Sequence, residues 1–137
     1  MGNYGFVKEW IEIADTDFAA ANHMATTMYP VPYAIVCFHC QQTAEKYIKG
    51  FLAFNDVEPP KIHDLIPLIN LCEPFNPKFS TMKEKCVSLT EYGVEPRYPM
   101  ENHIELGEMN RALLYTKEII SFIRNEVPEM FKEETNG

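Results

Sequence analysis

The chain has 137 residues, of which 46% are hydrophobic, and this size and composition fit a single domain over residues 1–137 with one core. Twenty acidic residues against twelve basic ones give a net charge of −8, which argues against a broad electrostatic grip on nucleic acid or on an anionic membrane. No run of about 18 apolar residues occurs and the N-terminus lacks a secretory pattern, so we expect a cytoplasmic protein without membrane contact.

The first predicted helix begins near Phe6 and ends before residues 29–32, where two prolines cannot continue a helix. Asp17 falls on its apolar stripe, where an unpaired carboxylate is costly. We therefore expect Asp17 to have a structural role and to meet Arg97, Lys46 or a backbone donor. The apolar stripe consists of Phe6, Trp10, Ile13, Ala14, Ala21, Met24 and Met28.

Apolar residues three and four apart between Tyr33 and Phe54 predict a second long helix. Cys37 and Cys40 form a CxxC pair on its apolar stripe, and a second paired half of a zinc site is missing. We therefore expect reduced, buried thiols and neither a metal nor a cofactor. The polar residues of this helix are expected to form a solvated or dimer-facing side: Gln41, Gln42, Glu45 and Lys49.

Shorter elements follow a predicted turn at residues 55–60. His63-Asp64-Leu65 marks the N-terminus of a brief apolar helix that runs to Leu71. Ser80 is the predicted N-cap of a fourth segment that ends near Tyr92, before Gly93.

A last long helix is predicted by a stripe that contains Leu106, Met109, Leu113, Thr116, Ile120, Ile123, Val127 and Met130. The sequence therefore predicts an all-α fold, an antiparallel up-and-down bundle of three long and two short helices.

The start of the last helix can be interpreted in two ways. Asn102 and Glu105 resemble a capping box, which places His103 in the first turn, where free N–H groups favour an anion. Alternatively, Pro99 at the first helical position with Glu101 two residues later places His103 one turn inside the helix.

Four stretches together resemble the HEPN domain, the "higher eukaryotes and prokaryotes nucleotide-binding" family, over about residues 6–127. They are Trp10 with Ala14 and Asp17-Phe18, FHCQQTAEKYIKGFL at 38–52, His63-Asp64-Leu65, and Arg97-Tyr98-Pro99. The resemblance implies a helical bundle that forms a homodimer. Many members are metal-independent RNases with an Arg, four to six residues and then a His, and small members often act as toxins beside a minimal nucleotidyltransferase antitoxin. Arg97 and His103 match this signature with five residues between them.

The two residue types suit RNA cleavage without a metal. Such cleavage needs a base for the 2′-OH proton, an acid for the 5′-oxygen and positive charge for the phosphate oxygens. Arg97 supplies a charged fork and His103 a proton carrier, and a dimer that joins two such pairs supplies both acid and base. Tyr98, Asn102, Asp17 and Lys46 are the candidate substrate-binding or supporting residues.

Other interpretations stay open. Arg97 can pair with Glu95 or Glu101 in an ordinary turn, which leaves His103 solvated. The domain can also be a non-catalytic module that binds a nucleotide, RNA or a nucleotidyltransferase, or an unrelated helical scaffold.

Overall fold

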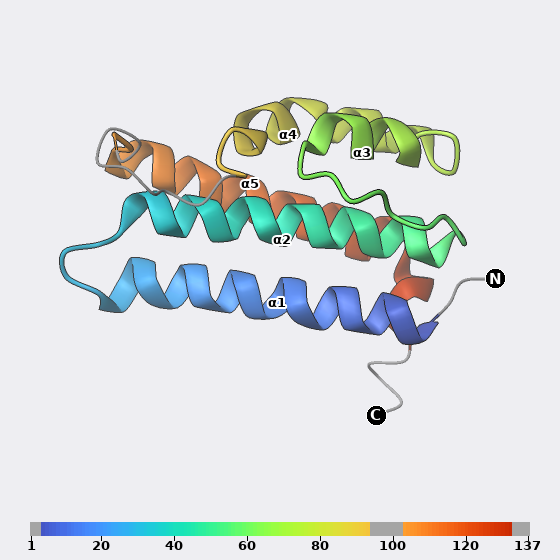
Figure 1. Ribbon diagram of the computed structural model, residues 1–137, viewed down its shortest axis with the longest axis horizontal. Coiled ribbons are helices and arrows are strands. Elements are labelled where there is room, and N and C mark those ends of the chain that lie inside the picture. Colours follow the sequence, from blue (N-terminus) through green and yellow to red (C-terminus); the bar gives the residue numbers. More distant parts are fainter. Residues whose placement is uncertain (1–3, 94–102, 133–137) are drawn as a thin grey trace.

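The computed structural model describes residues 4–93 and 103–132, and the described residues form helices and loops without a strand (Figure 1). Three long and two short α-helices confirm the predicted all-α bundle. They are α1 (Tyr4–Thr27), α2 (Tyr33–Phe54), α3 (Leu65–Cys72), α4 (Lys83–Thr90) and α5 (Leu106–Glu126), with 3₁₀ helices η1 (Pro77–Met82) and η3 (Pro128–Phe131).

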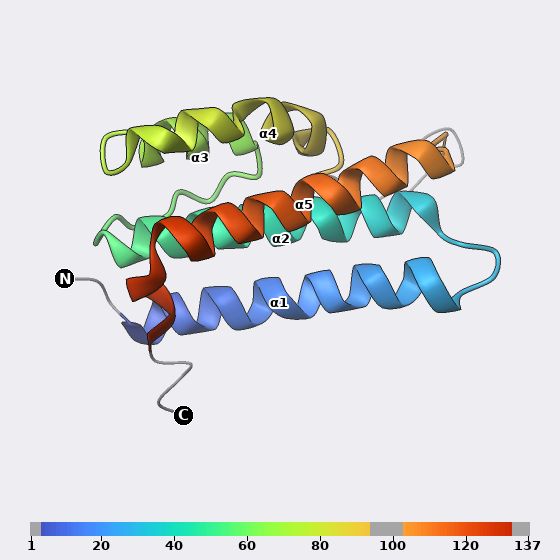
Figure 2. The same ribbon diagram turned by 180° about the vertical axis from the view of Figure 1, so that it is seen from behind.

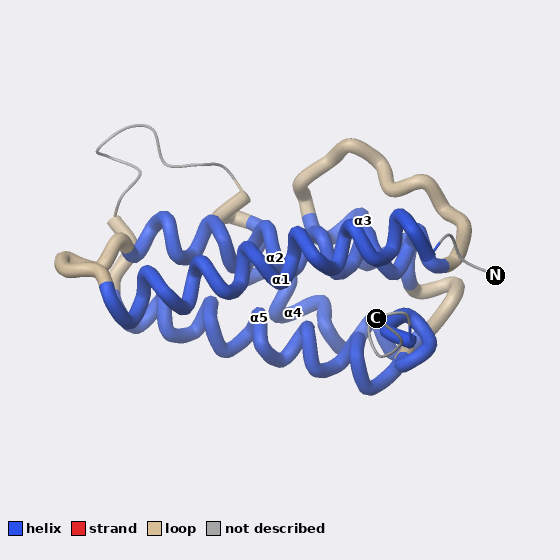
Figure 3. The backbone as a smooth tube through the Cα atoms, turned by 90° about the horizontal axis from the view of Figure 1, so that it is seen from below, coloured by secondary structure: helices blue, strands red, loops and turns tan. Residues whose placement is uncertain are grey.

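Helix α2 lies at the centre of the bundle and packs against α1, α3, α4 and α5. Figure 1 shows α1 on one side of α2 and the α3–α4 pair on the other, and Figure 2 shows α5 running along α2 on the rear face. Because neighbours cover α2 from several directions, its apolar stripe and much of its polar side are buried. Figures 1 and 2 show α1 and α2 side by side along most of their length, and Figure 3 shows the helices and loops of the described residues from below.

The inward face of α1 differs from the predicted stripe. Its core residues are Val7, Ile11, Ala14 and Ala21, whereas Phe6, Ile13 and Met28 are exposed by 59%, 49% and 47%. An outer helix buries only a narrow stripe, so apolar residues beside that stripe stay at the surface. The contact with α2 is close at Gly50, where an added Cβ would lie 3.2 Å from Ile11 Cδ1.

The connection through α3 and α4 was predicted in part. Helix α3 begins where His63-Asp64-Leu65 predicted, and Asp64 caps it by accepting a hydrogen bond from the N–H of Ile66 (3.0 Å). The Ser80 cap was wrong, because Asn76 caps η1 by accepting from the N–H of Lys78 (3.0 Å) and Ser80 lies inside η1. Pro77 at the first position starts the helical turn earlier than the apolar pattern indicates.

Helix α5 starts at Leu106, later than either predicted start, with Glu105 as an N-cap whose side chain makes no capping hydrogen bond. His103 therefore precedes the helix, and its predicted place in the first turn or one turn inside is wrong. Ile104 is half-buried against the beginning of α2, and this tertiary contact outweighs the local capping pattern. Leu106 is 52% exposed and is not part of the buried stripe.

The C-terminal end of the described chain closes the core beside α1 and α2. Helix α5 ends at Glu126, and η3 continues the predicted apolar stripe with buried Met130 and Phe131. The Tyr47 hydroxyl donates to Asp15, and Arg124 Nε donates to that hydroxyl (3.2 Å). These contacts tie α5 to both helices.

Candidate functional site

His103 is exposed in the short segment that leads into α5. Beside it, Ile104 and residues 31–35 line a hollow of about 250 Å³. Arg97, Tyr98 and Asn102 lie outside the described residues, so the pairing of Arg97 with His103 and the roles of Tyr98 and Asn102 remain predictions.

Two exposed apolar side chains lie near His103, one close in sequence and one at the same end of the bundle. Leu106 is 52% exposed at the start of α5, and Ile35 is 42% exposed on α2, where it lines the same hollow as Ile104. Because contiguous apolar patches are typical of surfaces that another molecule covers, these side chains make this end of the bundle a candidate for such a surface.

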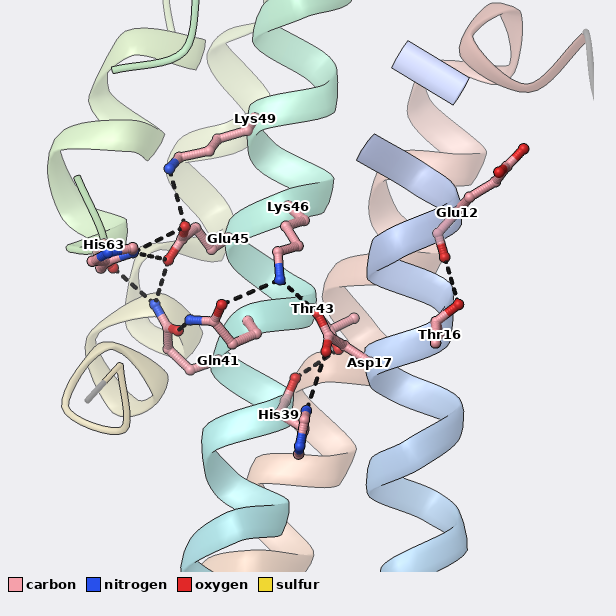
Figure 4. A network of polar contacts seen from close by, with 11 residues as sticks. Glu12, Thr16, Asp17, His39, Gln41, Thr43, Glu45, Lys46, Lys49 and His63 are labelled. Carbon is pink, nitrogen blue, oxygen red and sulfur yellow. Dashed lines mark hydrogen bonds and ion pairs between the residues drawn. The ribbon is translucent and has the colours of Figure 1, made fainter. Parts of the chain in front are cut away.

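Asp17, Lys46 and His39 form a half-buried cluster between α1 and α2 (Figure 4). Lys46 Nζ lies 2.8 Å from Asp17 Oδ2, and His39 Nδ1 lies 3.1 Å from Asp17 Oδ1. The prediction that Asp17 meets Lys46 is confirmed. These contacts cross-link the two helices, while a supporting role toward a substrate stays a prediction.

A second cluster joins α2 to the loop before α3. Glu45, with a side chain only 3% exposed, lies 3.0 Å from Lys49 Nζ, and its two oxygens lie 3.0 and 3.1 Å from His63 Nδ1. Gln41 Nε2 donates to the His63 carbonyl (2.8 Å) and lies 3.3 Å from Glu45 Oε1. The expectation of a solvated or dimer-facing side is wrong for Gln41, Glu45 and Lys49, because residues of other elements cover them.

Gln42 connects the two clusters. Lys46 Nζ donates to Gln42 Oε1 (3.2 Å), and Gln42 Nε2 donates to Gln41 Oε1 (2.7 Å). A continuous row of polar contacts therefore runs from α1 across α2 to His63 (Figure 4).

The end of α4 lies beside this network and beside the start of α5. An added Cβ on Gly93 would lie 3.2 Å from Gln41 Nε2, so the backbone at Gly93 passes directly against Gln41. The hydroxyl of Tyr92 donates to Glu108 Oε2 in the first turn of α5 (3.0 Å). Burial and this acceptor raise the pKa of the Tyr92 phenol. Gly93, the last described residue before Arg97 in the sequence, thus lies beside the His63 cluster.

A separate cavity of about 460 Å³ lies between the first turns of α1 and the loop after α2. Phe6, Trp10 and Lys49 line it together with residues 56–61. Lys49 Nζ lies 5.8 Å from the centroid of the Trp10 ring, so an aromatic ring and a cation meet at one wall.

The four cysteines are all free and buried. Burial raises the pKa of Cys37, Cys40 and Cys86 to about 12, and it also raises the pKa of Cys72. Cys37 and Cys40 lie on the core stripe of α2, as the periodicity predicted. Among the described residues, His, Cys, Asp and Glu side chains do not gather in threes that could hold a metal ion.

Sequence reasoning missed His63 and Glu45 as functional candidates. The available signal was the spacing of Gln41, Glu45 and Lys49, which are four residues apart and therefore share one side of a helix. These three polar residues on one side of a helix, followed by the His63-Asp64-Leu65 segment, can indicate that His63 joins a polar cluster on α2. The sequence does not show that the loop before α3 covers this side of the helix.

Comparison with known proteins places this arrangement in a family. Neither the search of curated proteins nor the search of solved structures found a match. Within residues 4–93 and 103–132, no helix has the length and apolar character needed to cross a bilayer. The family model described as "HEPN domain" matches residues 7–126, which is nearly the whole chain and includes, among the described residues, α1 from its first turn onward and α2 to α5. The chain therefore belongs to the HEPN domain family.

Proposed function

We propose that the protein is a metal-independent endoribonuclease of the toxin type, with Arg97 and His103 as its catalytic pair. The observation that carries the proposal is the exposure of His103 before α5, in a HEPN domain whose sequence places Arg97 six residues earlier. An exposed imidazole can reach a phosphodiester without rearrangement of the core.

The chemistry needs only groups that the chain supplies. A base takes the proton of the ribose 2′-OH, the 2′-oxygen attacks phosphorus, and the bond from phosphorus to the 5′-oxygen breaks as an acid protonates that oxygen. Arg97 would hold the phosphate oxygens through its planar fork. The products would be a 2′,3′-cyclic phosphate and a free 5′-hydroxyl.

We propose that the protein acts as a homodimer with the catalytic pairs at a cleft between subunits. The exposed apolar side chains of Leu106 and Ile35 support an interface near His103. A minimal nucleotidyltransferase is the proposed antitoxin partner, and its co-expression would relieve growth arrest caused by the chain alone.

Incubation with RNA in EDTA tests the nuclease proposal. The native protein should cut RNA, whereas His103→Ala and Arg97→Ala should each lower the rate by about 10²–10⁴-fold. His23→Ala, which removes an exposed histidine on α1, is the matched control and should keep full activity. Cleavage that survives both catalytic substitutions would contradict the proposal.

The second candidate function is a non-catalytic module that binds a nucleotide. The cavity of about 460 Å³ favours it, because Trp10 offers a stacking surface and Lys49 a positive charge. Titration calorimetry with ATP and with GTP should then show that at least one of them binds and that Trp10→Ala weakens this binding. If neither nucleotide releases or absorbs heat, the nucleotide-binding function is contradicted.

A further inference from the structure

The cavity between α1 and the loop after α2 has a preformed wall, because both ends of that loop are fixed to α2. At the near end, the N–H groups of residues 56 and 57 donate to carbonyls in the last turn of α2 (3.0 and 2.9 Å). At the far end, the His63 carbonyl accepts a hydrogen bond from Gln41 Nε2 (2.8 Å). A ligand that enters the space of about 460 Å³ therefore meets an ordered wall at residues 56–61, so little free energy is lost in ordering the site.

Apolar and aromatic side chains make up most of the lining of this cavity. Phe6 and Trp10 are four residues apart on α1 and therefore share one face of the helix. The loop adds Val57 and Pro59-Pro60, and proline offers a hydrocarbon ring without a backbone N–H. These surfaces suit a flat apolar ring, whose faces they can cover.

Lys49 supplies a buried hydrogen-bond donor at the wall of the cavity. Its side chain is only 6% exposed, and its ammonium group carries three N–H donors. One of them is directed at Glu45 Oε2 (3.0 Å), and among the described residues Nζ makes no other hydrogen bond. Two donors are therefore available to an oxygen atom of a ligand in the cavity.

The charges around the cavity favour an uncharged acceptor over an anion. The Lys49 charge is already balanced by Glu45, and the other charged residues of the lining are Lys61 and the carboxylates of Asp56 and Glu58. A carboxylate or phosphate at Lys49 would lose its hydration without meeting a surplus of positive charge. A carbonyl oxygen can accept from the same ammonium group at a much smaller desolvation cost.

We propose that this cavity binds an uncharged aromatic molecule with a carbonyl oxygen, such as an aromatic amide, with its ring against Trp10 and its oxygen at Lys49 Nζ. The inference rests on one part of the second candidate function, the presence of a small-molecule site in this cavity, and it names the ligand class of that site. The carbonyl, rather than a phosphate, is the group that the protein selects. The proposed nuclease function is independent of it.

Four ligands that share a benzene ring test the ligand class. Benzamide is uncharged and has a carbonyl, benzoate is an anion, benzylamine is a cation, and toluene has no polar group. Titrations of the native protein at neutral pH, followed by the NMR signals of each ligand, should show that benzamide binds at least about tenfold more tightly than the other three. Binding of any of these three as tight as that of benzamide would overturn the choice of a carbonyl.

Aromatic substitutions locate the ligand ring. Trp10→Ala should weaken benzamide binding at least about tenfold, and Trp10→Phe should restore most of the affinity because it restores a ring. The control is Tyr29→Ala, which removes a ring that is 98% exposed in the segment between α1 and α2, outside the cavity lining. Benzamide binding that is unchanged in Trp10→Ala would overturn the proposed site.

A paired substitution tests the donor. Glu45→Gln, Lys49→Met removes the ammonium group without leaving one buried charge alone, and benzamide should then bind no more tightly than toluene. Toluene affinity within about threefold of the native value would show that the cavity is intact. Benzamide binding at the native strength in this variant would overturn the role of Lys49. If thermal melts show an unfolded variant, the four-ligand series on the native protein decides the ligand class.

Titrations with ATP and GTP separate this inference from the nucleotide-binding function. Benzamide binding without nucleotide binding would support the ligand class and overturn the nucleotide-binding function. Nucleotide binding that Trp10→Ala weakens, without benzamide binding, would keep the nucleotide-binding function and overturn the ligand class. A native protein that binds none of these molecules would overturn both.

Discussion

At the scale of single residues, Glu45 lies in the core because three groups meet its carboxylate, two from α2 itself and one from the following loop. Lys49 lies one helical turn away, Gln41 one turn earlier, and His63 comes from the following loop. Each partner replaces a water molecule that the carboxylate loses on burial. Removing one partner is therefore expected to destabilise the fold more than replacing the whole cluster with apolar residues of similar volume.

We predict that Glu45→Ala lowers the free energy of unfolding by about 3–5 kcal/mol, because it leaves Lys49 buried without its carboxylate. Urea denaturation would measure the change. Glu9→Ala, which removes an exposed carboxylate from α1, is the control and should alter stability by less than about 0.5 kcal/mol. A similar small change for Glu45→Ala would contradict the burial of the pair.

The buried thiols predict a loss of stability at alkaline pH. Burial raises the pKa of Cys37 and Cys40 from 9.0 to about 12, so the folded state favours the protonated thiols. Their contribution is complete below pH 9.0 and is lost as the pH rises toward about 12. Urea midpoints at pH 8 and pH 10 would measure this fall. A Cys37→Ala, Cys40→Ala double variant should show a smaller fall, and an equal fall would assign the effect to other groups.

At the scale of elements, α3 and α4 are held together by a reciprocal contact at Asp64 and Thr90. The hydroxyl of Thr90 accepts from the N–H of Leu65 (2.9 Å), and Asp64 Oδ1 accepts from the N–H of Ile66 (3.0 Å) and from the Thr90 hydroxyl (3.2 Å). The first free N–H groups of α3 are therefore satisfied from two elements.

We predict that Asp64→Ala destabilises the protein by about 1 kcal/mol and that Asp64→Asn restores most of the loss. Because Asp64 and Thr90 share a hydrogen bond, the double variant Asp64→Ala, Thr90→Ala should lose less than the sum of the two single variants. A double-mutant cycle by urea denaturation would measure the coupling. Strict additivity would show that the two ends of the helices are independent.

Helical periodicity predicted α1, α2 and α5, because it depends on residues three to four apart, and the His63-Asp64-Leu65 pattern predicted the N-terminus of α3. Such local patterns failed where distant parts of the chain decide the outcome. The start of α5 depends on Ile104 packing against α2, and the burial of Glu45 depends on His63, 18 positions along the chain. The CxxC pair was correctly placed in the core because its neighbours on the stripe are all apolar. Arg97 lies outside the described residues, so that half of the predicted pair rests on sequence alone.

At the scale of the whole molecule, α2 is the element through which the other helices are held together. It contacts α1 on one side, α3 and α4 on another and α5 along the rear. The polar network on α2 therefore extends from the His63 cluster to the cavity at Lys49. Leu106 remains exposed at the start of α5, and this is where we propose a subunit interface.

We predict that the native protein is a dimer by light scattering and that Leu106→Glu raises its dissociation constant at least about 100-fold, because a charge would enter an apolar interface. The control is Val87→Glu on α4, where the native valine is similarly exposed (60%), and this variant should remain dimeric. Dissociation by the control variant alone would move the interface to the α4 face.

Trp10 is the sole tryptophan of the chain, and it is partly buried at the wall that it shares with Lys49. Its indole emission therefore reports on one known place, the junction of α1 and α2, without any added dye. A ligand that enters the neighbouring cavity, or a substitution that releases Lys49 from Glu45, would change the intensity or wavelength of that emission. The protein thus carries its own optical probe for occupancy of the cavity and for the state of the buried charges behind it.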